Sequence, residues 1–148
     1  MTPEKKIRTL ERLKSIREKI RDETRRRMNQ CEERSRSAEE EVRRLDRSWT
    51  SAVAGFSRSC RNCRSIDDLW LLREDIEGLE KKLRNAEQER LALQKELDGL
   101  KVELSRQHAE FRIAESILDG HRKAERSERL RREEKTLEEI ALSRFAAD

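Results

Sequence analysis

The sequence has very few of the residues that interrupt helices, since it contains one proline, Pro3, and four glycines in 148 residues. No stretch alternates apolar and polar residues with a period of two, so strands and long loops have little support. Only 33% of the residues are hydrophobic and 3% are aromatic, whereas 46% are charged. A globular core of ordinary thickness is therefore excluded, and the chain must be disordered or bury only narrow apolar stripes.

Long apolar runs are missing as well. No window approaches the roughly 18 apolar residues of a membrane-spanning helix, and the N-terminus lacks the apolar core of a signal peptide. The three cysteines are an odd number, which argues against a disulfide framework and for reduced thiols. We therefore expect a cytoplasmic chain.

The second half has a regular apolar pattern, with seam residues spaced by three and then four positions from Leu69 to Leu118. They are Leu69, Leu72, Ile76, Leu79, Leu83, Ala86, Arg90, Leu93, Leu97, Leu100, Leu104, Gln107, Phe111, Ala114 and Leu118. Only Arg90 and Gln107 break the pattern. Such sustained heptads predict a coiled-coil helix, for which Ser65 is a suitable N-cap.

The first half has a weaker pattern with the same spacing. It runs through Met28, Cys31, Ser35, Ala38, Val42, Leu45, Trp49, Ala52 and Phe56, and is preceded by a stripe of Ile7, Leu10, Leu13, Ile16 and Ile20. Thr2 as N-cap and Pro3 as first helical residue favour a helix start at this point.

These patterns predict an all-α fold in which two long helices form one antiparallel coiled-coil hairpin. We expect the first helix at about 3–57, the tip loop at about 57–65 and the second helix at about 66–144. Matching the two heptad patterns around this tip pairs Met28 with Leu93, Val42 with Leu79 and Trp49 with Leu72. The same register places Arg27 near Glu96 and Arg34 near Glu89.

In this register the segment from Gly120 to Asp148 has no partner helix within the chain. If helical, it would extend by about 40 Å. It carries an apolar stripe of Leu130, Leu137, Ile140, Ala141 and Phe145. Basic residues surround the stripe: Arg122, Lys123, Arg126, Arg129, Arg131, Arg132 and Lys135. A lone helix of this kind is marginal in water, so we expect it to bind a partner.

A second exposed apolar site is expected near the tip, where Leu69, Trp70, Leu71 and Leu72 are consecutive. A helix cannot direct four consecutive residues at one partner, and Leu69 with Leu72 already occupies the seam. Trp70 and Leu71 should therefore point outward and contact another protein. The alternative is that Trp70 folds over the tip and shields Ile66 and Phe56.

The C-terminal segment Arg131-Arg132-Glu133-Glu134-Lys135-Thr136-Leu137-Glu138-Glu139-Ile140-Ala141, together with the longer second helix, resembles the FliJ/YscO family of type III secretion stalk proteins. The resemblance implies a cytoplasmic stalk, peripheral to an inner-membrane export apparatus, that inserts into a hexameric export ATPase. It also implies contacts with an export-gate membrane protein and with secretion chaperones.

The resemblance also suggests which residues would make these contacts. Those expected to meet the ATPase are Arg122, Arg126, Arg131, Arg132, Lys135, Leu137 and Ile140. Trp70 and Leu71, remote from that end, are expected to meet the export gate. Whether the system is flagellar or an injectisome stays open.

No set of residues predicts catalysis, a cofactor or a metal site. Cys60 and Cys63 form a single C-x-x-C without a second ligand pair, and His108 and His121 have no neighbouring cysteine. We therefore expect neither an enzyme nor a small-molecule substrate. Two alternatives remain: an RNA-binding coiled-coil arm that uses Arg25 to Arg27 and the tip arginines, and a structural coiled-coil spacer. The first is disfavoured because the net charge is only +4.

Overall fold

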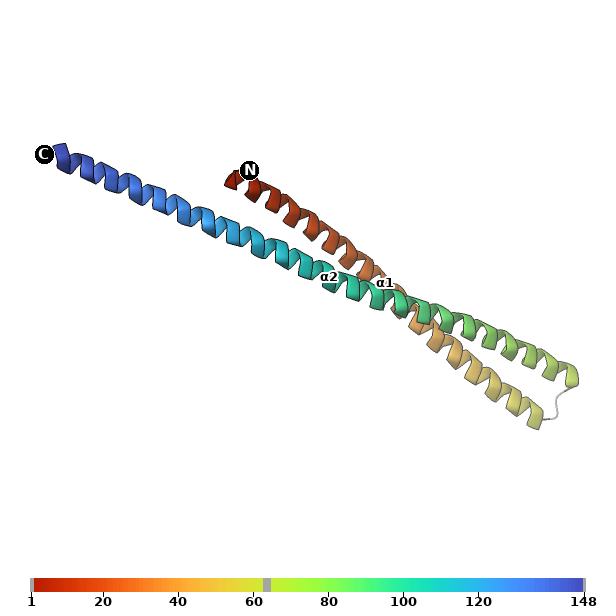
Figure 1. Cartoon of the computed structure of the whole chain (residues 1–148). Helices are drawn as coiled ribbons and strands as arrows, with labels where there is room; N and C mark the ends of the chain where they lie inside the picture. Colours follow the sequence, from red (N-terminus) through yellow and green to blue (C-terminus); the bar gives the residue numbers. More distant parts are fainter. Residues whose placement is uncertain (1, 63–64, 148) are drawn as a thin grey trace. The chain divides into compact units, whose positions relative to one another are not determined.

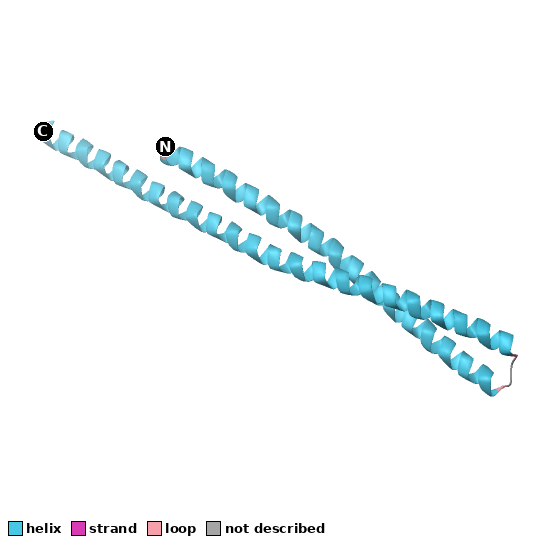
Figure 2. Cartoon of the chain, turned by 45° about the vertical axis from the view of Figure 1, so that its right-hand side comes forward, coloured by secondary structure: helices cyan, strands magenta, loops and turns pink. Residues whose placement is uncertain are grey.

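The computed structural model describes residues 2–62 and 65–147. Within these ranges the chain forms two helices, α1 (Pro3–Arg61) and α2 (Ile66–Ala147), and no strand (Figures 1 and 2). The helices pack against each other as a hairpin, which confirms the predicted all-α fold. Packing divides the chain into two compact units. Unit 1 comprises Met1–Thr24 with Leu104–Asp148, and unit 2 comprises Arg25–Glu103.

Both predicted N-caps are present. Thr2 Oγ1 accepts a hydrogen bond from the Lys5 backbone N–H at 3.4 Å, and Ser65 Oγ accepts one from the Asp68 N–H at 3.3 Å. These bonds satisfy donors that the first helical turn leaves without partners. The local sequence therefore determines where each helix begins.

The end of α1 differs from the prediction, because the helix continues to Arg61 instead of ending at about 57. The Asn62 N–H still bonds the Arg58 carbonyl at 3.1 Å. Serine and arginine do not break a helix. The positive side chains of Arg58 and Arg61 in the last turn interact favourably with the negative end of the helix dipole. The polar composition of residues 57–61 therefore did not mark the position of the turn.

Unit 2 has an apolar seam between the two helices. Its buried cluster consists of Cys31, Leu93, Leu97 and Leu100, with Met28 and Ala38 packed against it. Nearer the tip Leu45 is still buried, but the other seam residues are only half-buried. The indole Nε1 of Trp49 donates to Glu80 Oε1 at 3.2 Å. The middle of unit 2 is therefore its best-packed part.

The helices pair one heptad away from the predicted register. Arg27 Nη2 lies 3.9 Å from Glu103 Oε1, and Arg34 Nη2 lies 3.4 Å from Glu96 Oε1, so each arginine faces a residue seven positions beyond its predicted partner. The reason is the longer α1. Because α1 ends at Arg61, the centre of the turn lies about three residues further along the chain than predicted. The numbers of two paired residues add up to twice the number at that centre, so each residue of α1 pairs with a residue of α2 about twice that distance further on. A heptad shift keeps apolar residues opposite apolar residues, so the repeat alone could not reveal it.

Unit 1 has a different seam, in which α2 supplies buried apolar residues, whereas α1 supplies several charged side chains and the fully buried Thr24. Phe111, Ala114 and Leu118 of α2 are buried. The guanidinium carbon of Arg21 lies 4.4 Å from the centre of the Phe111 ring. Arg17 Nη1 donates to Glu110 Oε2 at 2.7 Å, a side-chain contact that links the helices.

Only the first two residues of the apolar stripe predicted at the start of α1 lie in the seam. Ile7 and Leu10 are half-buried, but Leu13, Ile16 and Ile20 are 39%, 54% and 41% exposed. Extending the heptads of α1 back from Met28 places Lys14, Arg17 and Arg21 at the seam positions instead. Ion pairs and the stacking of Arg21 on Phe111 hold that face against α2.

Candidate partner-binding sites

The C-terminal part of α2 forms an extension beyond the start of α1 within unit 1 (Figure 1). Every residue from 126 to 147 is exposed. At about 1.5 Å per residue this extension is about 33 Å long, shorter than the predicted 40 Å because the register differs. Its first turns, at Glu128, Arg129 and Arg132, line a hollow together with the start of α1, and the rest of the extension is a fully exposed helix.

One of the predicted basic contact residues lies outside the extension and is engaged within the chain. Arg122 Nη2 donates to Glu11 Oε1 of α1 at 2.9 Å, so this arginine helps to hold unit 1 together. The set of basic residues available to a partner therefore begins further along α2. Among the described residues, Arg126, Arg131 and Lys135 are exposed and form no ion pair.

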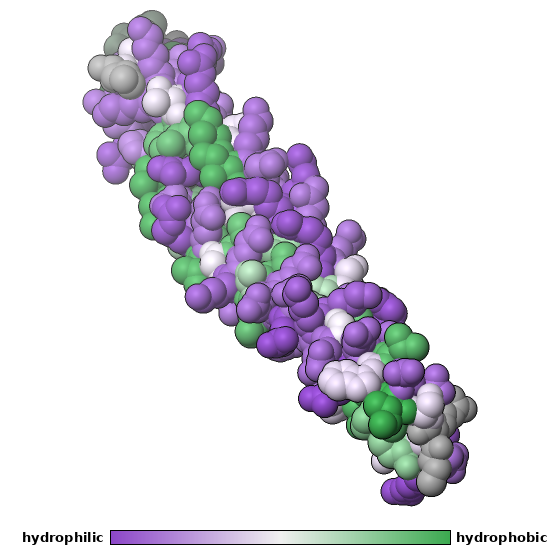
Figure 3. Space-filling view, turned by 90° about the vertical axis from the view of Figure 1, so that its right-hand side faces the viewer, coloured by the Kyte–Doolittle hydropathy of each residue, from purple (hydrophilic) through white to green (hydrophobic). Residues whose placement is uncertain are grey.

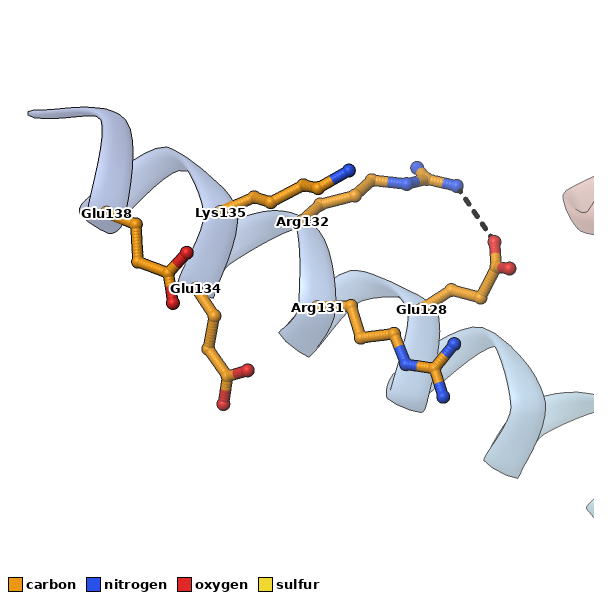
Figure 4. Close-up of a pocket in the computed structure, with 6 residues that line it drawn as sticks. All are labelled: Glu128, Arg131, Arg132, Glu134, Lys135 and Glu138. Carbon is orange, nitrogen blue, oxygen red and sulfur yellow. Dashed lines mark hydrogen bonds and ion pairs between the residues drawn. The ribbon is translucent and has the colours of Figure 1, made fainter.

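The remaining charges of the extension stabilise its helix. Arg129 Nη2 lies 3.7 Å from Glu125 Oε1, and Arg132 Nη2 lies 3.3 Å from Glu128 Oε2. In each pair the acid comes four residues before the arginine. This order is the favourable one in a helix, although exposed pairs contribute only about 0.3–0.5 kcal/mol each. Figure 4 shows Arg132 reaching back to Glu128, beside Lys135.

Apart from Leu142, the large apolar residues of the extension do not continue the seam of α2. The spacing of three and four that includes Leu118 leads to charged positions, among them Glu128, Arg132 and Lys135. Leu137 and Ile140, at 65% and 47% exposure, lie on a different side of the helix. A partner of this extension would thus approach from a direction that α1 does not use.

The tip site is exposed as predicted. Trp70 and Leu71 are 59% and 61% exposed, and the guanidinium carbon of Arg73 lies 5.8 Å from the centre of the Trp70 ring. The alternative in which Trp70 shields Ile66 is not observed, because Ile66 is itself 73% exposed. Three large apolar side chains therefore lie on the outside of the first turns of α2.

The cysteines and histidines of the described ranges do not belong to any group that could hold a metal ion. Cys31 is fully buried, its thiol donates to the Leu93 carbonyl at 3.7 Å, and burial raises the pKa of that thiol, helped by the nearby Glu96 carboxylate. Cys60 is exposed and free, while Cys63 lies outside the described residues. Among the residues that the structure describes, no group of acidic, cysteine and histidine side chains could hold a metal ion.

Neither helix, over its described length, has a segment apolar enough to cross a membrane. No protein-family model, curated protein or solved structure matches this chain. The two exposed sites are therefore the features of the chain that suggest a function.

Proposed function

We propose that this chain is the stalk component of a type III secretion export apparatus, as its resemblance to the FliJ/YscO family suggests. The observation that carries the proposal is the exposed extension at 126–147, a helix that combines free basic side chains with Leu137 and Ile140. A ring-shaped ATPase with an acidic central opening would suit such a helix, because opposite charge steers it inward and apolar contacts tolerate rotation.

The second part of the proposal concerns the export gate. Trp70 and Leu71 are exposed near the tip, and tryptophan is frequent at the energetic centres of protein interfaces. A stalk that binds the ATPase through the extension and the gate through these residues would couple the two. The resemblance also suggests that secretion chaperones bind, but it assigns them no residues.

The test of the ATPase contact uses the full-length chain and a hexameric export ATPase. Arg131, Arg132 and Lys135 are changed together to glutamate, and in a second variant Leu137 and Ile140 are changed to serine. We expect both variants to stay helical and to lose co-purification with the ATPase and stimulation of ATP hydrolysis. Leu91→Ser is the matched control, because Leu91 is 54% exposed in unit 2. Full stimulation by both variants would refute the proposal.

The gate contact is tested separately. Trp70→Ala with Leu71→Ala should leave helicity and ATPase binding intact but weaken binding to the cytoplasmic part of the export gate. A loss of helicity would mean that these side chains stabilise the hairpin, and the tip interface would then be abandoned.

The same proteins distinguish the alternatives. An RNA-binding arm would bind generic RNA with an affinity that falls steeply with salt. A spacer would bind none of these partners. Arg27 already faces Glu103 at 3.9 Å, which lowers the charge that the Arg25 to Arg27 segment could offer to phosphates.

A further inference from the structure

Unit 1 has an exposed apolar flank to which neither the extension nor the tip contributes. We define the apolar flank as Leu13, Ile16 and Ile20 of α1 with Ile113 and Ile117 of α2, which are 39%, 54%, 41%, 60% and 45% exposed. Apolar side chains surrounded by polar ones are visible on the face shown in Figure 3. Five large aliphatic side chains from two helices on one flank are more than the scattered exposure that is normal for a protein surface.

The two rows of the flank lie on the same side of the helix pair. On the opposite side, Glu11 directly follows seam residue Leu10, and it bonds Arg122, which directly follows seam position 121. Residues that directly precede seam positions such as Lys14 and Leu118 must then lie together on the other side of the helix pair. Leu13 precedes Lys14 in this way on α1, and Ile117 precedes Leu118 on α2. Seven residues are nearly two turns, so Ile20 lies in the row of Leu13.

Ile16 and Ile113 extend these rows outward. Ile16 is three residues after Leu13 and four before Ile20, and Ile113 is four residues before Ile117, so each lies beside its row on the helix surface. The result is an exposed apolar strip to which α1 and α2 each contribute one row. Such a strip suits the apolar stripe of a third helix, whose anchors recur at the same spacing of three and four.

The border of the flank on α1 is basic. Lys6 lies one heptad before Leu13, while Arg12 and Lys19 lie on either side of Ile16 along the helix. All three are exposed, and none forms an ion pair among the described residues. Two acids lie on this side. Glu110 already accepts hydrogen bonds from Arg17 at 2.7 Å and from Arg106 at 3.0 Å, and Glu23, one heptad after Ile16, also has an interaction partner. The available charge is therefore positive.

We propose that the apolar flank binds an amphipathic helix of a partner protein whose apolar stripe is bordered by aspartate and glutamate. Shape calls for a helix, and charge complementarity with Lys6, Arg12 and Lys19 calls for an acidic one. An anionic membrane is the less suitable occupant, because the flank has no tryptophan or phenylalanine of the kind that anchors interfacial helices.

The test measures binding of a fluorescent synthetic peptide to the full-length chain by anisotropy. The probe is a three-heptad helix with leucine and isoleucine on one side and glutamate beside them, and its counterpart has lysine in place of glutamate. We expect the acidic peptide to bind at least about tenfold more tightly than the basic one. Ile16→Ser with Ile113→Ser should weaken that binding by at least about tenfold, and Arg12→Glu with Lys19→Glu should reverse the preference.

Matched controls carry the same changes elsewhere. Val102→Ser removes a residue that is 72% exposed, and Lys81→Glu with Lys95→Glu reverses two exposed charges of unit 2, so both should leave binding unchanged. Three results would overturn the proposal: equal binding of both peptides, acidic-peptide binding that Ile16→Ser with Ile113→Ser does not affect, and binding only to vesicles of phosphatidylcholine with phosphatidylserine. A dimer that sedimentation shows to dissociate in the serine variant would also overturn it, since the flank would then join two copies.

Discussion

The helices α1 and α2 pack against each other through different kinds of residue in the two units. Unit 2 buries Leu93, Leu97 and Leu100 against Cys31, whereas α1 in unit 1 places Lys14 and Arg21 against Phe111. An apolar seam gains free energy from each buried methylene, while exposed ion pairs contribute little. Unit 2 should therefore supply most of the stability of the hairpin, although its residues Trp70 and Leu71 are exposed.

The largest difference should come from truncating the seam of unit 2. Leu97 is 6% exposed in the buried cluster, so Leu97→Ala should lower the free energy of unfolding by about 2–5 kcal/mol. Leu91→Ala, at a position that is 54% exposed, should change it by less than about 0.5 kcal/mol. Urea denaturation followed by circular dichroism measures both, and equal losses would contradict the assignment of the core.

A change in unit 1 can make its seam more like that of unit 2. Lys14 Nζ lies 3.7 Å from Glu115, and the lysine side chain is 30% exposed. Lys14→Leu would bury an apolar side chain at the cost of an exposed ion pair, so it should stabilise the chain by about 1 kcal/mol. Thermal denaturation provides the measurement. A clear loss of stability would mean that the charged seam is the better solution at this site.

The sequence predicted the local features of the chain but not the way in which the two helices pair. Capping by Thr2 and Ser65 and the outward position of Trp70 depend on local sequence, and they were predicted. The register depended on where the turn lies, and a repeat of seven fits equally well one heptad away. In unit 1 the hydrophobic pattern favoured Leu13 and Ile20, but Arg21 packs on Phe111 instead. Extending the α1 heptads back from Met28 would have revealed this.

Glycines inside α2 offer a smaller effect that is shared by both units. A methyl group added at Gly99 in unit 2 or at Gly120 in unit 1 would meet no atom within 4 Å. Because glycine is about 1 kcal/mol less favourable than alanine in a helix interior, each Gly→Ala change should raise stability by about that amount. Thermal melts of the two variants would show it, and a loss of stability at either site would imply a need for glycine that the structure does not explain.

The smallest expected effect is a pH dependence that is confined to unit 2. Burial raises the pKa of Cys31 above its ordinary value of 9.0, so the folded chain keeps a proton that the unfolded chain loses. The stabilisation is complete below pH 9.0 and is lost as the pH rises through the folded pKa. Between pH 8 and 10, the free energy of unfolding of the natural chain should therefore fall more steeply than that of the Cys31→Ala variant. Parallel curves would show that the thiol does not contribute.

The register of the helices is the central structural claim, and cysteine cross-linking tests it most directly. In a background in which Cys31, Cys60 and Cys63 are replaced by alanine or serine, Val42→Cys is combined either with Ala86→Cys or with Leu79→Cys. The pairing of Arg34 with Glu96 places Val42 opposite Ala86, whereas the register first expected from the repeat places it opposite Leu79. We predict rapid intramolecular disulfide formation for the pair 42 and 86 with unchanged helicity, and slow formation for 42 and 79. Preferential linkage of 42 with 79, or only intermolecular linkage, would contradict the structure.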